Sequence, residues 1–140
     1  MIKGQNVRYL NVTPPAAIVG PSTSFVTAEI DTVDTRLGHA DKVFIVCVQG
    51  ATDAAFTALK VQDGDVSGTV ADVVGLRVGT DANIDGTTSV LPSATSDNGI
   101  TVFEIDCKKR KRFLDVVATL GTGTVGGFMC IIAILAYHDE

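Results

Sequence analysis

The chain has 140 residues and a mass of 14.6 kDa, the usual size of one domain, so one compact domain is expected and a large multidomain enzyme is not. Val, Thr and Ile supply 19, 16 and 10 residues, whereas Glu occurs three times and Trp is absent, a composition typical of β-proteins. Hydrophobic residues make up 46% of the chain and charged residues 19%, which excludes disorder. This composition predicts that part of the apolar surface contacts a partner.

The net charge of −5 argues against attraction of the whole domain to nucleic acid or to an anionic membrane. The three cysteines, Cys47, Cys107 and Cys130, cannot all pair within one chain, and their spacing fits no metal site. We therefore expect reduced thiols, no metal and no cofactor, in a protein made in the cytoplasm. The N-terminus lacks the apolar segment of a signal peptide, so secretion is not expected.

Two stretches with helix breakers, Pro14-Pro15 and Gly20-Pro21, lie in the first 22 residues. Because proline removes a backbone donor and interrupts hydrogen-bonded ladders, this segment predicts an extended arm that lies on a neighbouring molecule. Residues 23–140 then form a single domain. The arm should be mobile in the isolated subunit.

From residue 24 onward, short runs rich in β-branched residues alternate with turn residues, and no apolar face recurs at helical spacing. The pattern predicts an all-β, antiparallel β-sandwich of seven or eight strands. The predicted strands are 25–32, 43–48, 55–62, 100–107, 112–120 and 128–137, with 72–78 and 88–91 as further candidates.

Two of these strands alternate cleanly between apolar and polar residues, and the last one does not. In 100–107, Phe103, Ile105 and Cys107 share one face while Glu104 and Asp106 share the other. Segment 128–137 is apolar on both faces, as is 43–48, so these strands are either covered on both sides or covered on one side by another subunit. The candidate self-association residues are Phe128, Met129, Ile131, Ile132, Leu135 and Tyr137.

A cation-binding motif is suggested by Asp81, Asn83 and Asp85, which precede Gly86 and match the first six positions of a calcium-binding loop. The match then fails, because the twelfth position holds Pro92 in place of a bidentate Glu. A turn rich in Asp, Asn and Gly is the alternative interpretation, since these residues tolerate positive φ.

Catalytic signatures are missing from the chain, so an enzyme is not expected. There is no nucleophile elbow, and the two histidines, His39 and His138, stand apart in the sequence. Three carboxylates at Glu29, Asp31 and Asp34 have no neighbour in the sequence that would separate their pKa values into an acid and a base. The glycine-rich segment 121–127 joins two strands, and a phosphate loop would instead open a helix.

Five of the eleven basic residues are consecutive: Lys108, Lys109, Arg110, Lys111 and Arg112. They fit a solvated turn that keeps the flanking strands from pairing with other chains. They also fit a surface that docks on an acidic partner. Nucleic-acid binding is disfavoured, since the rest of the chain is acidic and no aromatic residues are interleaved for base stacking.

The segment 103–137 resembles the C-terminal part of small structural proteins encoded in the head gene clusters of tailed bacteriophages. The likeness lies in Phe103-Glu-Ile-Asp106, in the basic cluster that runs into Phe113-Leu114 and an Asp-Val-Val-Ala-Thr strand, and in a Gly/Thr turn before an Ala/Ile-rich final strand. Upstream, segment 58–68 is similar to the family's strand and loop.

In kind, the chain is most similar to jelly-roll cement proteins, which decorate the outside of a phage capsid and clamp its major capsid protein. The resemblance implies a jelly-roll-like sandwich without catalysis, located on the capsid exterior of the virion. It also implies self-association as a homodimer or other homo-oligomer. A receptor- or glycan-binding sandwich and a head-completion or tail subunit are the alternatives.

Overall fold

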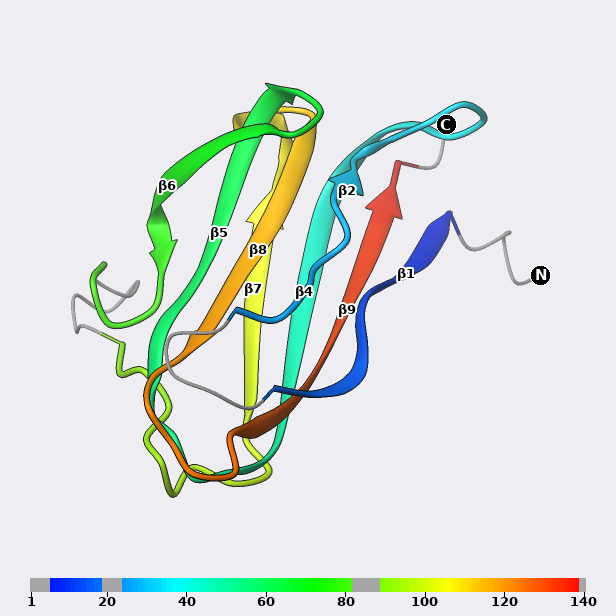
Figure 1. Ribbon diagram of the computed structural model, residues 1–140. Coiled ribbons are helices and arrows are strands. Elements are labelled where there is room, and N and C mark those ends of the chain that lie inside the picture. Colours follow the sequence, from blue (N-terminus) through cyan, green and yellow to red (C-terminus); the bar gives the residue numbers. More distant parts are fainter. Residues whose placement is uncertain (1–5, 19–23, 82–88, 139–140) are drawn as a thin grey trace.

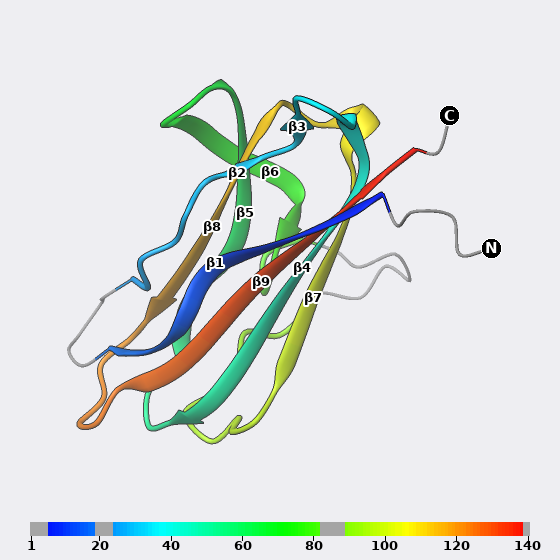
Figure 2. The ribbon, with the colours of Figure 1, turned by 90° about the vertical axis from the view of Figure 1, so that its right-hand side faces the viewer.

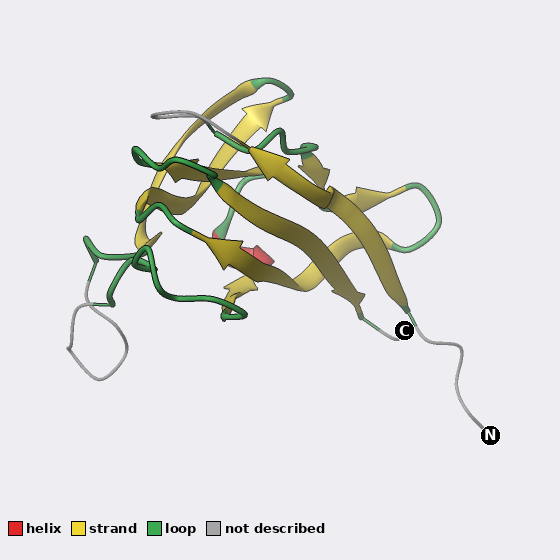
Figure 3. Cartoon of the chain, turned by 60° about the horizontal axis from the view of Figure 1, so that its bottom comes forward, coloured by secondary structure: helices red, strands yellow, loops and turns green. Residues whose placement is uncertain are grey.

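The computed structural model describes residues 6–18, 24–81 and 89–138. Among the described residues, the strands range from two to 15 residues in length, and the single helical element is a 3-10 turn, drawn in red in Figure 3. The elements are β1 (Val7–Ile18), β2 (Ile30–Asp31), β3 (Val33–Asp34), β4 (Gly38–Thr52), β5 (Phe56–Val66), β6 (Thr69–Arg77), β7 (Ile100–Asp106), η1 (Cys107–Lys109), β8 (Phe113–Leu120) and β9 (Gly127–Tyr137).

The strands form two antiparallel sheets that face each other (Figure 1). The first sheet has five strands in the order β1-β9-β4-β3, with β7 also paired to β4. The second sheet has four strands in the order β2-β8-β5-β6. Figure 2 shows β1, β9, β4 and β7 side by side. The predicted all-β, antiparallel, sandwich-like architecture is confirmed.

The core lies between the two sheets, and period-2 alternation sends one side chain in two toward it. In β7 and the residue that follows it, Phe103, Ile105 and Cys107 are buried while Glu104 and Asp106 are exposed, as the alternation predicted. The same holds for β8. The largest fully buried apolar side chains are Ile30, Val43, Ile45, Leu59, Val61, Leu114, Val116, Leu120, Ile131 and Leu135.

The predicted strand positions are mostly right, with two exceptions. Predicted strand 25–32 contributes only β2. The residues just before β2 do not form a strand, since they make only one isolated bridge, between Ser24 and Thr119 on β8. Of the candidate 88–91, residues 89–91 are not a strand, and residue 88 lies outside the described residues. The described residues contain nine strands, two of which are two residues long.

The N-terminal segment differs from the arm that the sequence predicted. Residues 7–18 are extended, but they pair as β1 with β9 of the same chain. Val12 and Thr13 are 3% and 1% exposed, so this strand contributes to the core. Pro14 and Pro15 are tolerated because β1 is an edge strand whose register shifts between Thr13 and Ala16. The rest of the predicted arm, residues 1–5 and 19–22, lies outside the described residues.

A carboxylate fixes the turn between β8 and β9. Asp53 accepts hydrogen bonds from the backbone N–H groups of Thr124, Val125 and Gly126, at 2.6 to 2.7 Å. These bonds favour the ionised form, so the pKa of Asp53 lies below its usual range. The glycine-rich segment 121–127 is thereby held against the end of β4.

Candidate functional site

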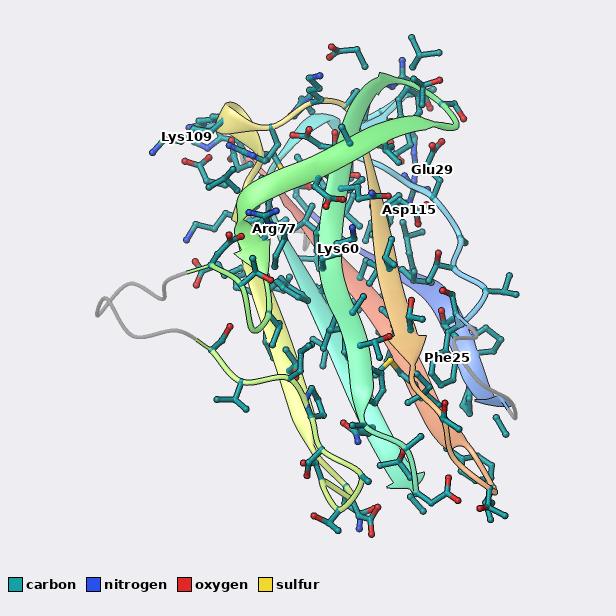
Figure 4. All side chains as sticks on the ribbon, turned by 60° about the vertical axis from the view of Figure 1, so that its left-hand side comes forward. Phe25, Glu29, Lys60, Arg77, Lys109 and Asp115 are labelled. Carbon is teal, nitrogen blue, oxygen red and sulfur yellow. The ribbon has the colours of Figure 1, made fainter. Side chains whose placement is uncertain are left out.

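The outer face of the second sheet carries polar side chains that are hydrogen-bonded to one another. Lys60 donates to Asp72 at 2.7 Å, Gln62 donates to the same carboxylate at 2.6 Å, and Thr27 donates to Asp115 at 2.9 Å. Figure 4 shows Lys60 and Asp115 on neighbouring strands of this sheet. This face has the alternation of a sheet with one side in water.

The outer face of the first sheet is apolar. Residues directly opposite each other in antiparallel strands share a face, so the register assigns its members. Ile100 and Val102 on β7 are 67% and 53% exposed, and Phe128 on β9 is 49% exposed. We define the outer face as the ten side chains Tyr9, Phe44, Val46, Val48, Ile100, Val102, Phe128, Cys130, Ile132 and Ile134.

These ten side chains form rows that run across the sheet. Ile132 lies opposite Val46, and Val46 lies opposite Val102, so one row spans β9, β4 and β7. Tyr9 lies opposite Ile134 and is 66% exposed, at the β1 edge of the next row. A contiguous exposed apolar surface of this kind marks a contact with a partner.

The structure separates the predicted self-association residues into two groups. Met129, Ile131, Leu135 and Tyr137 are at most 6% exposed and point into the core, so they are unavailable to a second chain. Phe128 and Ile132 are on the outer face. The interpretation that β9 is covered on both faces within one chain is wrong, because the second sheet covers only its inner face.

Sequence reasoning missed Tyr9, Ile100 and Val102, which the sheet pairing brings beside β9 and β4. By alternation Ile100 and Val102 share a face with Glu104, and Tyr9 lies in the segment predicted to be an arm, so the local pattern does not show which strands lie beside them. Only the register between strands distant in sequence places them together.

Charge on the outer face is confined to one end. Lys42 on β4 donates a hydrogen bond to Glu104 on β7, and this bond raises the pKa of Lys42. The pair is exposed, and Asp106, which lies opposite Lys42 on β7, places a second carboxylate at this end. The centre of the face therefore contains no charged side chain.

The other end of the outer face holds an open hollow of about 650 Å³. Gly50 helps to form it, because a Cβ atom there would lie 3.1 Å from the Cβ of Phe128. The lining is largely apolar. It consists of Pro15, Ala17, Val48, Gln49, Gly50, Asn98, Ile100, Phe128, Met129 and Cys130.

The basic cluster Lys108 to Arg112 is largely neutralised within the chain. Arg112 makes a bidentate pair with Asp31, at 2.9 and 2.7 Å, which lowers the pKa of Asp31. Lys109 is exposed and has no carboxylate within ion-pair distance among the described residues, and Figure 4 shows it at the margin of the molecule. The remaining pairs are Lys108 with Asp41, Arg110 with Asp63 and Lys111 with Asp65, at 3.7 to 3.8 Å.

The three carboxylates considered for acid and base roles have structural partners. Glu29 accepts from the turn between β5 and β6 at 2.6 and 2.7 Å, and Asp31 holds Arg112. Asp34 accepts from two backbone N–H groups in the turn between β3 and β4, which lowers its pKa. All three carboxylates therefore fix turns or strands.

The two histidines are distant in sequence, but both line one open hollow of about 680 Å³, together with Asn6, Thr35, Arg36, Leu37 and Gly38. His39 contacts the Thr32 hydroxyl at 3.3 Å and the Ala40 carbonyl oxygen at 2.9 Å. His138 lies 3.4 Å from Asp41. Thr32 is 0% exposed and its hydroxyl group donates to the Arg112 carbonyl oxygen at 2.7 Å, so this hydroxyl group is not available as a nucleophile.

The suggested calcium loop is only partly within the described residues. Asp81 accepts from the Gly75 and Arg77 backbone N–H groups and pairs with the Arg77 guanidinium at 2.8 Å, which lowers its pKa. Asn83 and Asp85 lie outside the described residues. Among the residues that the structure describes, no group of three His, Cys, Asp or Glu side chains could hold a metal ion.

All three cysteines are free. Burial raises the pKa of Cys47 to about 12 and the pKa of Cys107 to about 11. Cys130 is partly exposed on the outer face. The first two thiols are therefore protonated and inert at neutral pH.

No protein-family model matches the chain, and a search of curated proteins finds no match. Within the described ranges, no helix is long and apolar enough to cross a membrane. The candidate site that the described geometry offers is the apolar outer face of the first sheet.

Proposed function

We propose that the chain is a non-enzymatic structural subunit of a bacteriophage virion, a jelly-roll-like cement protein that binds and stabilises the major capsid lattice. The observation that carries this proposal is the apolar outer face, which a subunit of an assembly can bury and a solitary protein would leave in water. The resemblance of segment 103–137 to phage head proteins supplies the phage context.

The way the turns are held also supports a structural role. Asp53 fixes the β8–β9 turn and Glu29 fixes the β5–β6 turn, each through at least one backbone N–H group. Loops fixed in this way keep their shape when they meet a rigid lattice, and binding then costs little conformational entropy.

Within this proposal, the basic cluster supports docking on an acidic capsid surface. Lys109 is the member best placed to do so, since it is exposed and the other four have carboxylate partners in the chain. An exposed ion pair contributes only about 0.2 to 1 kcal/mol. Many such pairs on one lattice add up, and salt screens them.

The test is binding of the purified chain to capsids that lack it, measured by co-sedimentation. We expect saturable binding at a fixed ratio to the major capsid protein, and a higher temperature of DNA release from the bound particles. Lys109→Gln should weaken binding most at low ionic strength, and its difference from wild type should shrink as salt is added, with Arg36→Gln in the β3–β4 turn as the exposed-cation control. Absence of binding to capsids would refute the proposed function.

A further inference from the structure

We propose that two copies of this chain associate through their outer faces about a two-fold axis, with Tyr9 of each copy seated in the hollow of the other. This inference rests on the surface of the isolated chain and does not depend on a capsid. It assigns the outer face to a second copy, and it leaves the other surfaces free for a lattice.

The first argument is area. The four strands β1, β9, β4 and β7 lie about 4.8 Å apart, and the nine residues of β9 from Phe128 to Ala136 span about 30 Å, so the face covers roughly 600 Å². Stable pairs bury about 600 to 1,000 Å² on each partner. One copy therefore offers enough surface, without any further element, for a dimer at the small end of this range.

The second argument is charge. When the same face of two copies meets about a two-fold axis, a charge near the centre of the face lies close to the identical charge of the other copy, and the two repel. Here the centre is apolar, and the Lys42–Glu104 pair at one end is neutral within each copy. The outer face of the second sheet carries Lys60, Asp72 and Asp115, so it would not tolerate such packing. The centre of the outer face offers no charged side chain to an acidic or basic partner, since Lys42, Glu104 and Asp106 all lie at one end.

The third argument is shape. Tyr9 protrudes opposite Ile134, whereas the hollow lies beside Phe128 and Ala17, about 20 Å farther along β9. Tyr9 lies at the β1 edge of the face, and the hollow reaches this edge at Pro15 and Ala17 and extends across β9 and β4 to Ile100 on β7. A two-fold axis that runs across the strands near Ile131 exchanges the two ends, and so it places each Tyr9 over the hollow of the other copy.

Tyrosine suits this role, because its ring fills an apolar hollow while its hydroxyl group stays at the rim. The same axis brings Ile132, which is 37% exposed, close to the centre of the contact. Two sheet faces packed in this way form a layer about 10 Å thick, as in the interior of a β-sandwich. The geometry thus resembles a second sandwich core, made by two chains.

Sedimentation velocity on the full chain, over a range of concentrations and without capsids, tests the pairing. We expect wild type to sediment as a dimer and Ile132→Lys as a monomer with an unchanged circular dichroism spectrum. Val74→Lys is the matched control, since Val74 is 82% exposed on β6 of the other sheet, and it should remain dimeric. A wild type that is monomeric at the highest concentration, or an Ile132→Lys variant that still dimerises, would overturn the proposal.

The position of Tyr9 is tested separately. Tyr9→Ala should raise the dimer dissociation constant at least about tenfold, because the Tyr9 ring fills a hollow of the other copy. In a Cys130→Ser background, Tyr9→Cys combined with Ala17→Cys should give an intermolecular disulfide on oxidation. The two positions are eight residues apart on one strand, so they cannot bond within a chain. A dimer that forms no such cross-link contradicts the proposed register.

Discussion

Truncation of Ile131 and of Ile132, which are neighbours on β9, should have very different effects on stability. Ile131 is 0% exposed and Ile132 is 37% exposed on the opposite face. Ile131→Ala removes three buried carbon atoms, which costs about 2.4 kcal/mol of transfer free energy at about 0.8 kcal/mol per carbon, and the cavity adds about 1 kcal/mol. We therefore expect the free energy of unfolding to fall by about 3 to 4 kcal/mol.

Ile132→Ala should cost only about 1 kcal/mol in the monomer, because much of its side chain already lies in water. The assay is urea denaturation followed by circular dichroism, at a protein concentration low enough to keep the chain monomeric. Equal slopes for the two variants and wild type would show that the midpoints report stability. If the two variants lose similar amounts of stability, the assignment of the inner and outer faces of β9 is wrong.

Four further outcomes follow from the contacts described. Asp53→Asn should weaken the pH dependence of stability. The lowered pKa of Asp53 means that its carboxylate stabilises the fold above pH 3.8, and this stability is lost as the pH falls from 3.8 through the lowered pKa. The urea midpoints of Asp53→Asn at pH 7 and pH 3 should therefore differ less than those of wild type. Gly64→Ala should unfold at lower temperature, because its Cβ atom would overlap the carbonyl oxygen of Thr69 on β6. A melting temperature equal to that of wild type would contradict this close approach of β5 and β6. In native protein at pH 8, diluted until the chain is monomeric, a thiol reagent should modify Cys130 and spare Cys47 and Cys107, whose pKa values are raised by burial. Rapid labelling of all three cysteines would contradict the assignment of Cys47 and Cys107 to the core. Removal of β1 should lower the urea midpoint of the chain as well as weaken its attachment to capsids. An unchanged midpoint would support the original prediction that this segment is an arm outside the core.

The sequence was sufficient to predict the β-class, six of the strands and the inward faces of β7 and β8, because period-2 alternation is a local signal. It was insufficient for β1. Pro14 and Pro15 disfavour a central strand, and an edge strand that tolerates them has the same local pattern as a free arm.

The candidate surface could be predicted only in part. Both faces of β9 are apolar, so the sequence could not distinguish Ile131 in the core from Ile132 on the surface. The pairing of the basic cluster was also hidden, since Asp31, Asp41 and Asp63 are distant in sequence from Lys108 to Arg112. In both cases the missing information is the register between strands and the course of the loops.

Under the proposed function, cryo-electron microscopy of purified virions that contain this chain tests the central claim most directly. The account predicts density for paired β-sandwiches on the capsid exterior, with the outer faces of β9 and β4 turned toward each other across a local two-fold axis. Virions without this density, or single sandwiches whose outer faces are open to solvent, would contradict it.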